Sequence, residues 1–180
     1  PYLIRCGDKD YLYVQESQEN DYRMLNIYSL QDGKLSEGKD FDRGFSGTCQ
    51  LDPSDMELFS RTDLLSTRQI YRSYHVGEDG MPVENEKYEH IAGTDYGPLT
   101  LKQELKAELL ENETSDKGEE YTLKKGDELF FFRTDDKTFV DFKMKDGKLI
   151  RIKDIDSNDW PRKINGVDIE EIFDGVVYAG

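Results

Sequence analysis

Long apolar runs are absent from this sequence. No stretch approaches the ~20 apolar residues of a membrane-spanning helix, so we expect no transmembrane segment in this chain. A signal peptide is also missing, and the chain opens with PYLIRCGDKD, without Met and already in strand-like sequence. We therefore expect the chain to begin inside a longer gene product, and the missing leader is no evidence for the cytosol.

Basic residues are too few to balance the acids. The 180 residues include 24 Lys and Arg against 39 Asp and Glu, which gives a formal net charge of −15. Residues 1–97 hold 19 acids and 10 bases, and residues 98–180 hold 20 acids and 14 bases. Because an acidic field repels phosphate, we expect no nucleic-acid partner, and the charge also disfavours anionic lipid surfaces; solubility is the simplest role of the charge.

Cysteine is scarce, with Cys6 and Cys49 as the two examples. They could form one disulfide or remain two free thiols, and their spacing leaves this choice open. Neither belongs to a C-x-x-C pair, so the sequence supports neither a redox motif nor a structural zinc site.

The motif closest to a metal site is incomplete. Asp154, Asp156 and Asn158 occupy the first three ligand positions of a D-x-D-x-[DN]-G calcium loop. The sixth position is Asp159 instead of Gly, and the twelfth is Asn165 instead of a bidentate Glu. A polar turn fits these residues better than a weak extracellular Ca²⁺ contact, so we predict no metal and no cofactor.

Catalytic constellations are lacking as well. GFSGT around Ser46 resembles a G-x-S-x-G nucleophile turn, but its fifth position is Thr48 and the strand-turn-helix context is missing. No glycine-rich phosphate loop occurs, and paired carboxylates are too common in so acidic a chain to identify a glycosidase. We therefore predict no catalytic residue and no enzymatic activity.

Strand-forming residues and turn signals are abundant. Aromatic residues make up 12% of the chain, including 11 Tyr, and Asp-Gly pairs between apolar runs favour hairpins. We predict an all-β protein in which residues 1–97 form an antiparallel meander similar to propeller blades. The segment AGTDYGPLT is the best linker, because Gly93, Gly97 and Pro98 interrupt regular structure.

Residues 98–180 are predicted to form a small barrel with one short helical turn at Asp168 to Phe173. Residues 101–110 fit either a helix or a strand, and we favour a strand because the next segment needs a partner. Residues 121–153 alternate apolar and charged side chains between turn signals. The three aromatics Phe130 to Phe132 indicate a strand that is buried on both faces or bends.

Residues 123–153 resemble bacterial SH3-like (SH3b) barrels. The matching pieces are Lys125-Gly126-Asp127, the hairpin from Arg133 to Met144, and Asp146-Gly147-Lys148. The Gly-Trp pair that usually starts the last strand is absent, and Trp160 falls later in the sequence. The resemblance implies a non-catalytic barrel that binds cell-wall peptides.

The N-terminal part is similar to pieces of β-propeller repeats, as in NIYSLQDGK. Overall, the chain looks like secreted or lipid-anchored proteins of gut Firmicutes whose role is unassigned. This likeness implies an extracellular or cell-surface location.

We therefore predict a secreted or cell-surface binding or scaffolding protein whose partner is cell-wall peptide or glycan. The ligand contacts are expected at Trp160 and in the loops around Asp135 and Asp146. Trp160 has an alternative interpretation, which we favour, as a plug that closes the bottom of the barrel. Two other functions stay open, a carboxylate-based glycan hydrolase and a structural fragment of a larger propeller, which would expose apolar strand edges.

Overall fold

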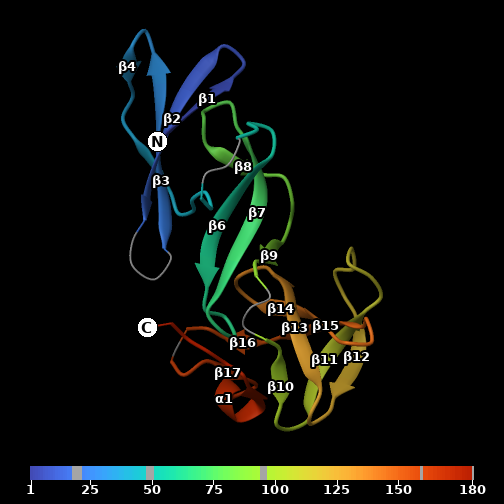
Figure 1. Ribbon diagram of the computed structural model, residues 1–180. Coiled ribbons are helices and arrows are strands. Elements are labelled where there is room, and N and C mark those ends of the chain that lie inside the picture. Colours follow the sequence, from blue (N-terminus) through green and yellow to red (C-terminus); the bar gives the residue numbers. More distant parts are fainter. Residues whose placement is uncertain (18–21, 48–50, 94–96, 159, 180) are drawn as a thin grey trace. The chain divides into compact units, whose positions relative to one another are not determined.

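The computed structural model describes residues 1–17, 22–47, 51–93, 97–158 and 160–179. It confirms the predicted all-β class, with antiparallel sheets and one short helix in the described residues. The chain divides into two compact units, Pro1–Arg61 with Gln69–Lys87 and Thr62–Arg68 with Tyr88–Gly180 (Figure 1). The predicted domain boundary after Gly97 stays a prediction.

The N-terminal unit is an antiparallel meander. One sheet has the order β1-β2-β3-β4, with β5 also paired to β3, and β6, β7 and β8 form the second layer. Its strands are β1 (Tyr2–Cys6), β2 (Lys9–Ser17), β3 (Arg23–Gln31), β4 (Lys34–Leu35), β5 (Lys39–Phe41), β6 (Met56–Thr62), β7 (Arg68–Val76) and β8 (Pro82–Glu84).

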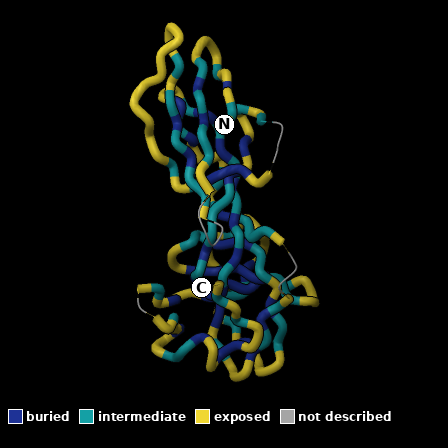
Figure 2. The backbone as a smooth tube through the Cα atoms, turned by 60° about the vertical axis from the view of Figure 1, so that its left-hand side comes forward, coloured by how far each residue is buried: buried dark blue, intermediate teal, exposed yellow. Residues whose placement is uncertain are grey.

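The residues in its tight turns determine how the strands of this meander are connected. Asp32 and Gly33 both have positive φ, at 51° and 72°, and they join β3 to β4. An Asp-Gly pair in this conformation matches the right-handed twist of a two-residue hairpin. The predicted hairpin at this position is therefore confirmed, and Figure 2 shows its segment, residues 31–40, exposed throughout.

The core of the N-terminal unit lies between its two layers. Alternate side chains of the first sheet are buried there, and Met56, Leu58, Tyr74 and Val76 meet them from β6 and β7. Tyr11 and Tyr13 bring hydroxyl groups into this core, where they donate hydrogen bonds to the carbonyls of Glu78 and Gly80 over 3.0 and 2.6 Å. These bonds satisfy the buried phenols and hold the 77–81 loop against β2.

The C-terminal unit is barrel-like. A curved sheet has the order β12-β11-β15-β14-β13-β9, and β10 pairs with both β13 and β19. The strands are β9 (Glu89–Ile91), β10 (Leu99–Leu101), β11 (Leu105–Leu110), β12 (Glu119–Leu123), β13 (Glu128–Thr134), β14 (Phe139–Lys143), β15 (Leu149–Lys153), β16 (Ile155–Asp156), β17 (Lys163–Ile164), β18 (Val167–Asp168) and β19 (Phe173–Asp174).

Two predictions about this sheet are confirmed. Residues 105–110 form strand β11, which lies between β12 and β15. The run Phe130 to Phe132 bends, because the β13–β14 register shifts between Phe131 and Arg133. Strand alternation puts Phe131 against the core and leaves Phe130 exposed on the other side, and the bulge follows at Phe132.

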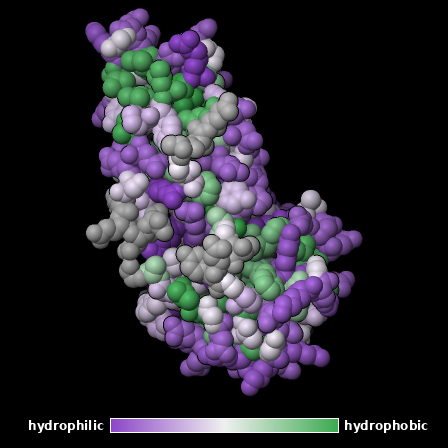
Figure 3. All heavy atoms as spheres, viewed as in Figure 1, coloured by the Kyte–Doolittle hydropathy of each residue, from purple (hydrophilic) through white to green (hydrophobic). Residues whose placement is uncertain are grey.

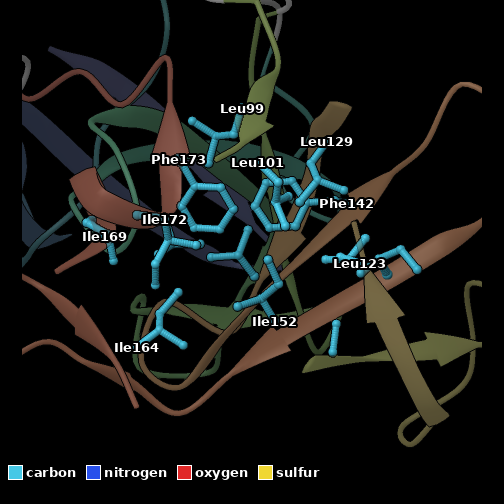
Figure 4. Packing of buried hydrophobic residues seen from close by; sticks show 14 of the residues in the cluster. Leu99, Leu101, Leu123, Leu129, Phe142, Ile152, Ile164, Ile169, Ile172 and Phe173 are labelled. Atoms are coloured by element: carbon cyan, nitrogen blue, oxygen red, sulfur yellow. The ribbon is translucent and has the colours of Figure 1, made fainter. Parts of the chain in front are cut away.

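The core of this unit is filled by aliphatic side chains and two phenylalanines (Figure 4). Leu129, Phe142 and Ile152 come from the curved sheet, and Ile172 and Phe173 come from the C-terminal segment. The predicted helical turn is α1 (Ile169–Ile172), whose N-cap Asp168 accepts a hydrogen bond from Glu170 N over 3.0 Å. Ile169 and Ile172 are buried, so α1 closes part of the core.

Candidate functional site

Among the described aromatic residues of the C-terminal unit, Trp160 is the most exposed. Its side chain is 61% exposed, and its ring centre lies 4.5 Å from that of Tyr178, edge to face at 78°. The Arg162 guanidinium lies 6.0 Å from the Trp160 ring centre, and the Trp160–Pro161 peptide bond is cis. This exposure does not fit the alternative interpretation of Trp160 as a barrel plug.

Hydrogen bonds fix the backbone of the residues immediately before and after Tyr178. Ser66 Oγ donates to Val177 O over 2.8 Å and accepts from Val177 N over 3.0 Å. Thr67 N also donates to Val177 O over 2.8 Å, and Thr67 Oγ1 accepts from Ala179 N over 2.9 Å. The backbone on each side of Tyr178 is therefore fixed, and the ring offers Trp160 a firm support.

Charged side chains lie near the aromatic pair, with Arg162 beside Trp160 and the carboxylates of Asp63, Asp168 and Glu170 close enough to influence Tyr178. Asp63 Oδ1 accepts from Thr67 Oγ1 over 2.5 Å, and Arg162 O accepts from Ile169 N over 3.1 Å at the start of α1. Burial raises the pKa of the Tyr178 phenol, the positive charge of Arg162 opposes this, and nearby carboxylates add to the increase. Tyr178 Oη and Arg162 Nε are buried without a hydrogen-bond partner in the described residues.

This arrangement can bind but offers little for bond breaking. An exposed indole supported by a second ring presents a flat apolar face, and a guanidinium and carboxylates nearby can exchange hydrogen bonds with hydroxyl groups. We name Trp160, Tyr178 and Arg162 the tryptophan platform. Sequence reasoning missed Tyr178 and Arg162, although the apolar run VVYAG after Gly175 signalled a segment that packs.

The Asp135 carboxylate accepts hydrogen bonds within the turn between β13 and β14. Its Oδ1 accepts from the backbone N–H groups of Lys137, Thr138 and Phe139 over 3.0, 2.8 and 3.1 Å, and Thr138 Oγ1 donates to Oδ2 over 2.6 Å. Partial burial acts to raise the pKa of Asp135, but these hydrogen bonds together hold it below its ordinary value. The carboxylate shapes a turn, and its role as a ligand contact stays a prediction.

Asp146 lies in the next turn, at the opposite end of β14. Its carboxylate accepts from Lys148 N over 3.1 Å and also contacts the Lys148 ammonium, and these bonds hold the pKa of Asp146 below its ordinary value. The turn borders a hollow of about 830 Å³, lined by residues 109–111, 117–119 and 146–149. Asp135 and Asp146 are thus not brought together.

The calcium candidate forms a polar turn in the described residues. Asp156 Oδ1 accepts from Asn158 N over 3.1 Å, and Asp154 adopts a positive φ of 56°. Asp159 lies outside the described residues. Elsewhere in the described ranges, no group of three or more histidine, cysteine or carboxylate side chains is placed to hold a metal.

Cys6 is half-buried, and its Sγ lies 3.9 Å from Val76 O. Cys49 lies outside the described residues, so the choice between one disulfide and two free thiols stays open. No helix in the described chain has the length and apolar character needed to cross a membrane.

Comparisons with known protein families, with curated proteins and with solved structures found no match to this chain. The likeness to SH3-like barrels therefore rests on the motifs of residues 123–153 alone.

Proposed function

We propose that the protein is a non-catalytic binding module of the cell surface that holds cell-wall glycan on the tryptophan platform. The observation that supports this proposal is that Trp160 is 61% exposed while its ring packs edge to face against Tyr178. A large aromatic side chain that stays in water gains none of the free energy that burial would give. A ligand that stacks on the ring removes its face from water and so gains that free energy.

The neighbours of Trp160 favour a sugar over an apolar ligand. A sugar ring has one face of C–H groups that can stack on an indole and an edge of hydroxyls that need hydrogen bonds. Arg162 can donate such bonds, and the carboxylate of Asp168, which lies close enough to Tyr178 to influence its phenol, can accept them. A stem peptide offers less to stack, so it serves as the comparison ligand in the test.

The chain contains one tryptophan, so Trp160 reports its own contacts. We expect purified cell-wall glycan strands to change the intrinsic tryptophan emission and to protect Trp160 from acrylamide quenching. Trp160→Ala should reduce retention on insoluble cell wall by about tenfold or more, the effect of roughly 1.4 kcal/mol of lost contact.

The control is Phe130→Ala, which removes another exposed aromatic side chain from the same unit and should leave retention unchanged. If glycan strands leave the Trp160 signal unaltered and released stem peptides change it, the ligand is peptide and not glycan. If neither changes it, the binding role of Trp160 is wrong. The hydrolase and propeller-fragment hypotheses stay predictions.

A further inference from the structure

Two hydrogen-bond donors of the tryptophan platform lack an acceptor. Tyr178 Oη and Arg162 Nε are both buried, and neither has a hydrogen-bond partner in the described residues. Buried polar groups nearly always have such a partner, because a buried donor that makes no hydrogen bond lowers stability. Both groups flank Trp160, whose ring centre lies 4.5 Å from that of Tyr178 and 6.0 Å from the Arg162 guanidinium. Two unmade hydrogen bonds beside an exposed indole point to a ligand that completes them.

The missing partner is an acceptor. Arg162 Nε can only donate, because a guanidinium has no acceptor atom. The Tyr178 phenol keeps its proton near neutral pH, because burial, together with nearby carboxylates, raises its pKa. Its O–H is therefore also available to donate. A carbonyl oxygen has two lone pairs and no proton of its own, so it can accept from two donors.

The surroundings disfavour an acceptor that carries a negative charge. The Tyr178 phenol is influenced by three nearby carboxylates, those of Asp63, Asp168 and Glu170. The positive charge of Arg162 balances one of them. Hydrophilic side chains cover much of the face that Figure 3 shows, and the whole chain carries −15. Because an acidic field repels a carboxylate or a phosphate, a neutral carbonyl is the acceptor that fits.

An N-acetylated amino sugar combines a neutral carbonyl with a face that can stack. Its acetamido group replaces one ring hydroxyl, and the carbonyl projects from the edge of the sugar ring. When the C–H face lies on Trp160, that edge comes next to the side chains that flank the indole. The acetamido methyl group is apolar and can pack against an aromatic ring such as that of Tyr178. A plain hydroxyl would bring a third donor to a place where two donors already lack an acceptor.

We propose that the tryptophan platform selects N-acetylated amino sugars, whose acetamido carbonyl accepts hydrogen bonds from Tyr178 Oη and Arg162 Nε. This inference rests on the proposed binding of glycan at Trp160, and it adds the class of sugar. Tyr178 and Arg162 are half-buried, and their unpartnered atoms lie beneath the surface, so the two side chains must rearrange as the ligand enters. Side-chain rearrangements of this kind are common when complexes form.

Two oligosaccharides test this selection on the full chain. Oligomers of β-linked N-acetylglucosamine and of β-linked glucose, equal in length and linkage, differ only in the acetamido group. Titrations followed by the emission of Trp160 should give a dissociation constant at least about tenfold lower for the acetylated oligomer. Tyr178→Phe removes Oη and keeps the ring, and Arg162→Met removes Nε; each should reduce this preference by about threefold or more.

The matched control is Tyr121→Phe, which makes the same chemical change at a half-buried tyrosine of β12, outside the platform. It should leave the preference unchanged. Because Tyr178 Oη has no partner in the free protein, Tyr178→Phe should not lower the urea midpoint, whereas the loss of a hydrogen bond that exists in the free protein would.

The outcomes separate this inference from the proposed function. If both oligomers change the Trp160 emission with equal affinity, glycan binding stands and the selection for the acetamido group is wrong. A preference that Tyr178→Phe and Arg162→Met both retain would also overturn the proposal, because the two donors would not read the acetamido group. So would tighter binding of the deacetylated glucosamine oligomer, whose ammonium groups the nearby carboxylates attract. If none of the oligomers and no glycan strand changes the emission, the proposed function fails as well.

Discussion

Asp141 and Arg151 face each other across β14 and β15, and Arg151 Nε donates to Asp141 Oδ1 over 2.6 Å. Arg151 Nη2 and Arg133 Nε donate to Oδ2 over 2.8 and 2.7 Å, so one carboxylate joins two guanidinium groups. The Asp141 side chain is fully buried. The rings of Tyr88 and Phe139 cover the guanidiniums of Arg133 and Arg151, at 4.4 and 3.7 Å. A charged cluster thus replaces an apolar layer on this face of the sheet.

Removing the Asp141 carboxylate should strongly lower the stability of the protein. Asp141→Asn keeps the shape of the side chain, but it leaves the buried guanidinium groups of Arg133 and Arg151 without their negative partner. Breaking a buried ion pair from one side costs roughly 3–5 kcal/mol, and urea unfolding should show a loss of that size. The matched comparison is the triple variant Arg133→Met, Asp141→Leu, Arg151→Met, which removes every charge and should recover most of the stability. A triple variant as unstable as Asp141→Asn would show that packing, and not charge, decides the result.

Gly80 is a position where a side chain cannot be added. Its φ is +83°, and a Cβ built there would lie 2.2 Å from the Tyr11 ring. Gly80→Ala should therefore destabilise the protein by more than the ~1 kcal/mol of an unfavourable backbone conformation alone. Gly7→Ala is the control, since Gly7 has a positive φ of 61° and no atom within 4 Å of the added carbon. Equal losses in chemical unfolding would mean that the Tyr11 ring yields without cost.

Short-range signals account for most of the fold. The Asp32-Gly33 turn and the short helix capped by Asp168 were predictable, because each depends on residues close in sequence. The strand at residues 105–110 was favoured for a different reason, since the local sequence also fits a helix and the following strand needs a partner. The charged cluster had a signal too, since Asp141 interrupts the apolar run TFVDF. Once the hairpin turns are placed correctly, the strand register puts Arg133 of β13 and Arg151 of β15 opposite Asp141.

The candidate site was only partly predictable. Trp160 could be named from composition, as the one tryptophan of the chain. Its support by Tyr178 depends on hydrogen bonds from Ser66 to Val177, which join segments 111 residues apart. No local pattern encodes such pairings. Asp135 illustrates a different point, because the carboxylate that we predict as a ligand contact also accepts hydrogen bonds within its own turn, as turn aspartates commonly do.

Asp135→Asn should weaken the protein in a pH-dependent way. Hydrogen bonds to a charged carboxylate contribute about 1–2 kcal/mol net, and the amide keeps only part of them. Since the folded-state pKa of Asp135 lies below the ordinary 3.8, its contribution is complete near neutral pH and is lost as the pH falls through the folded value. The difference in unfolding free energy between wild type and Asp135→Asn should therefore be constant near neutral pH and shrink as the pH falls below the ordinary value of 3.8.

The comparison for that series is Glu104→Gln, which removes an exposed carboxylate outside this turn. It should change stability by less than about 0.5 kcal/mol. A wild-type to Asp135→Asn difference that is constant with pH would show that the turn depends on side-chain shape and not on the charge.

Ser66→Ala tests whether the tryptophan platform is rigid because of the C-terminal segment. Ser66 is buried, and its hydroxyl makes two hydrogen bonds to the backbone of Val177, next to Tyr178. Alanine removes both and leaves the Val177 N–H without its partner, so we expect a loss of about 1–3 kcal/mol.

The more specific expectation concerns Trp160. With Tyr178 released, the indole should move more freely, so the fluorescence anisotropy of the single tryptophan should fall and its quenching by acrylamide should rise below the unfolding temperature. Ser36→Ala, an exposed serine of the N-terminal unit, should leave both signals unchanged. If Ser66→Ala lowers stability but leaves the anisotropy as in wild type, Trp160 is held by its own segment, and Tyr178 is a neighbour of the platform and not its support.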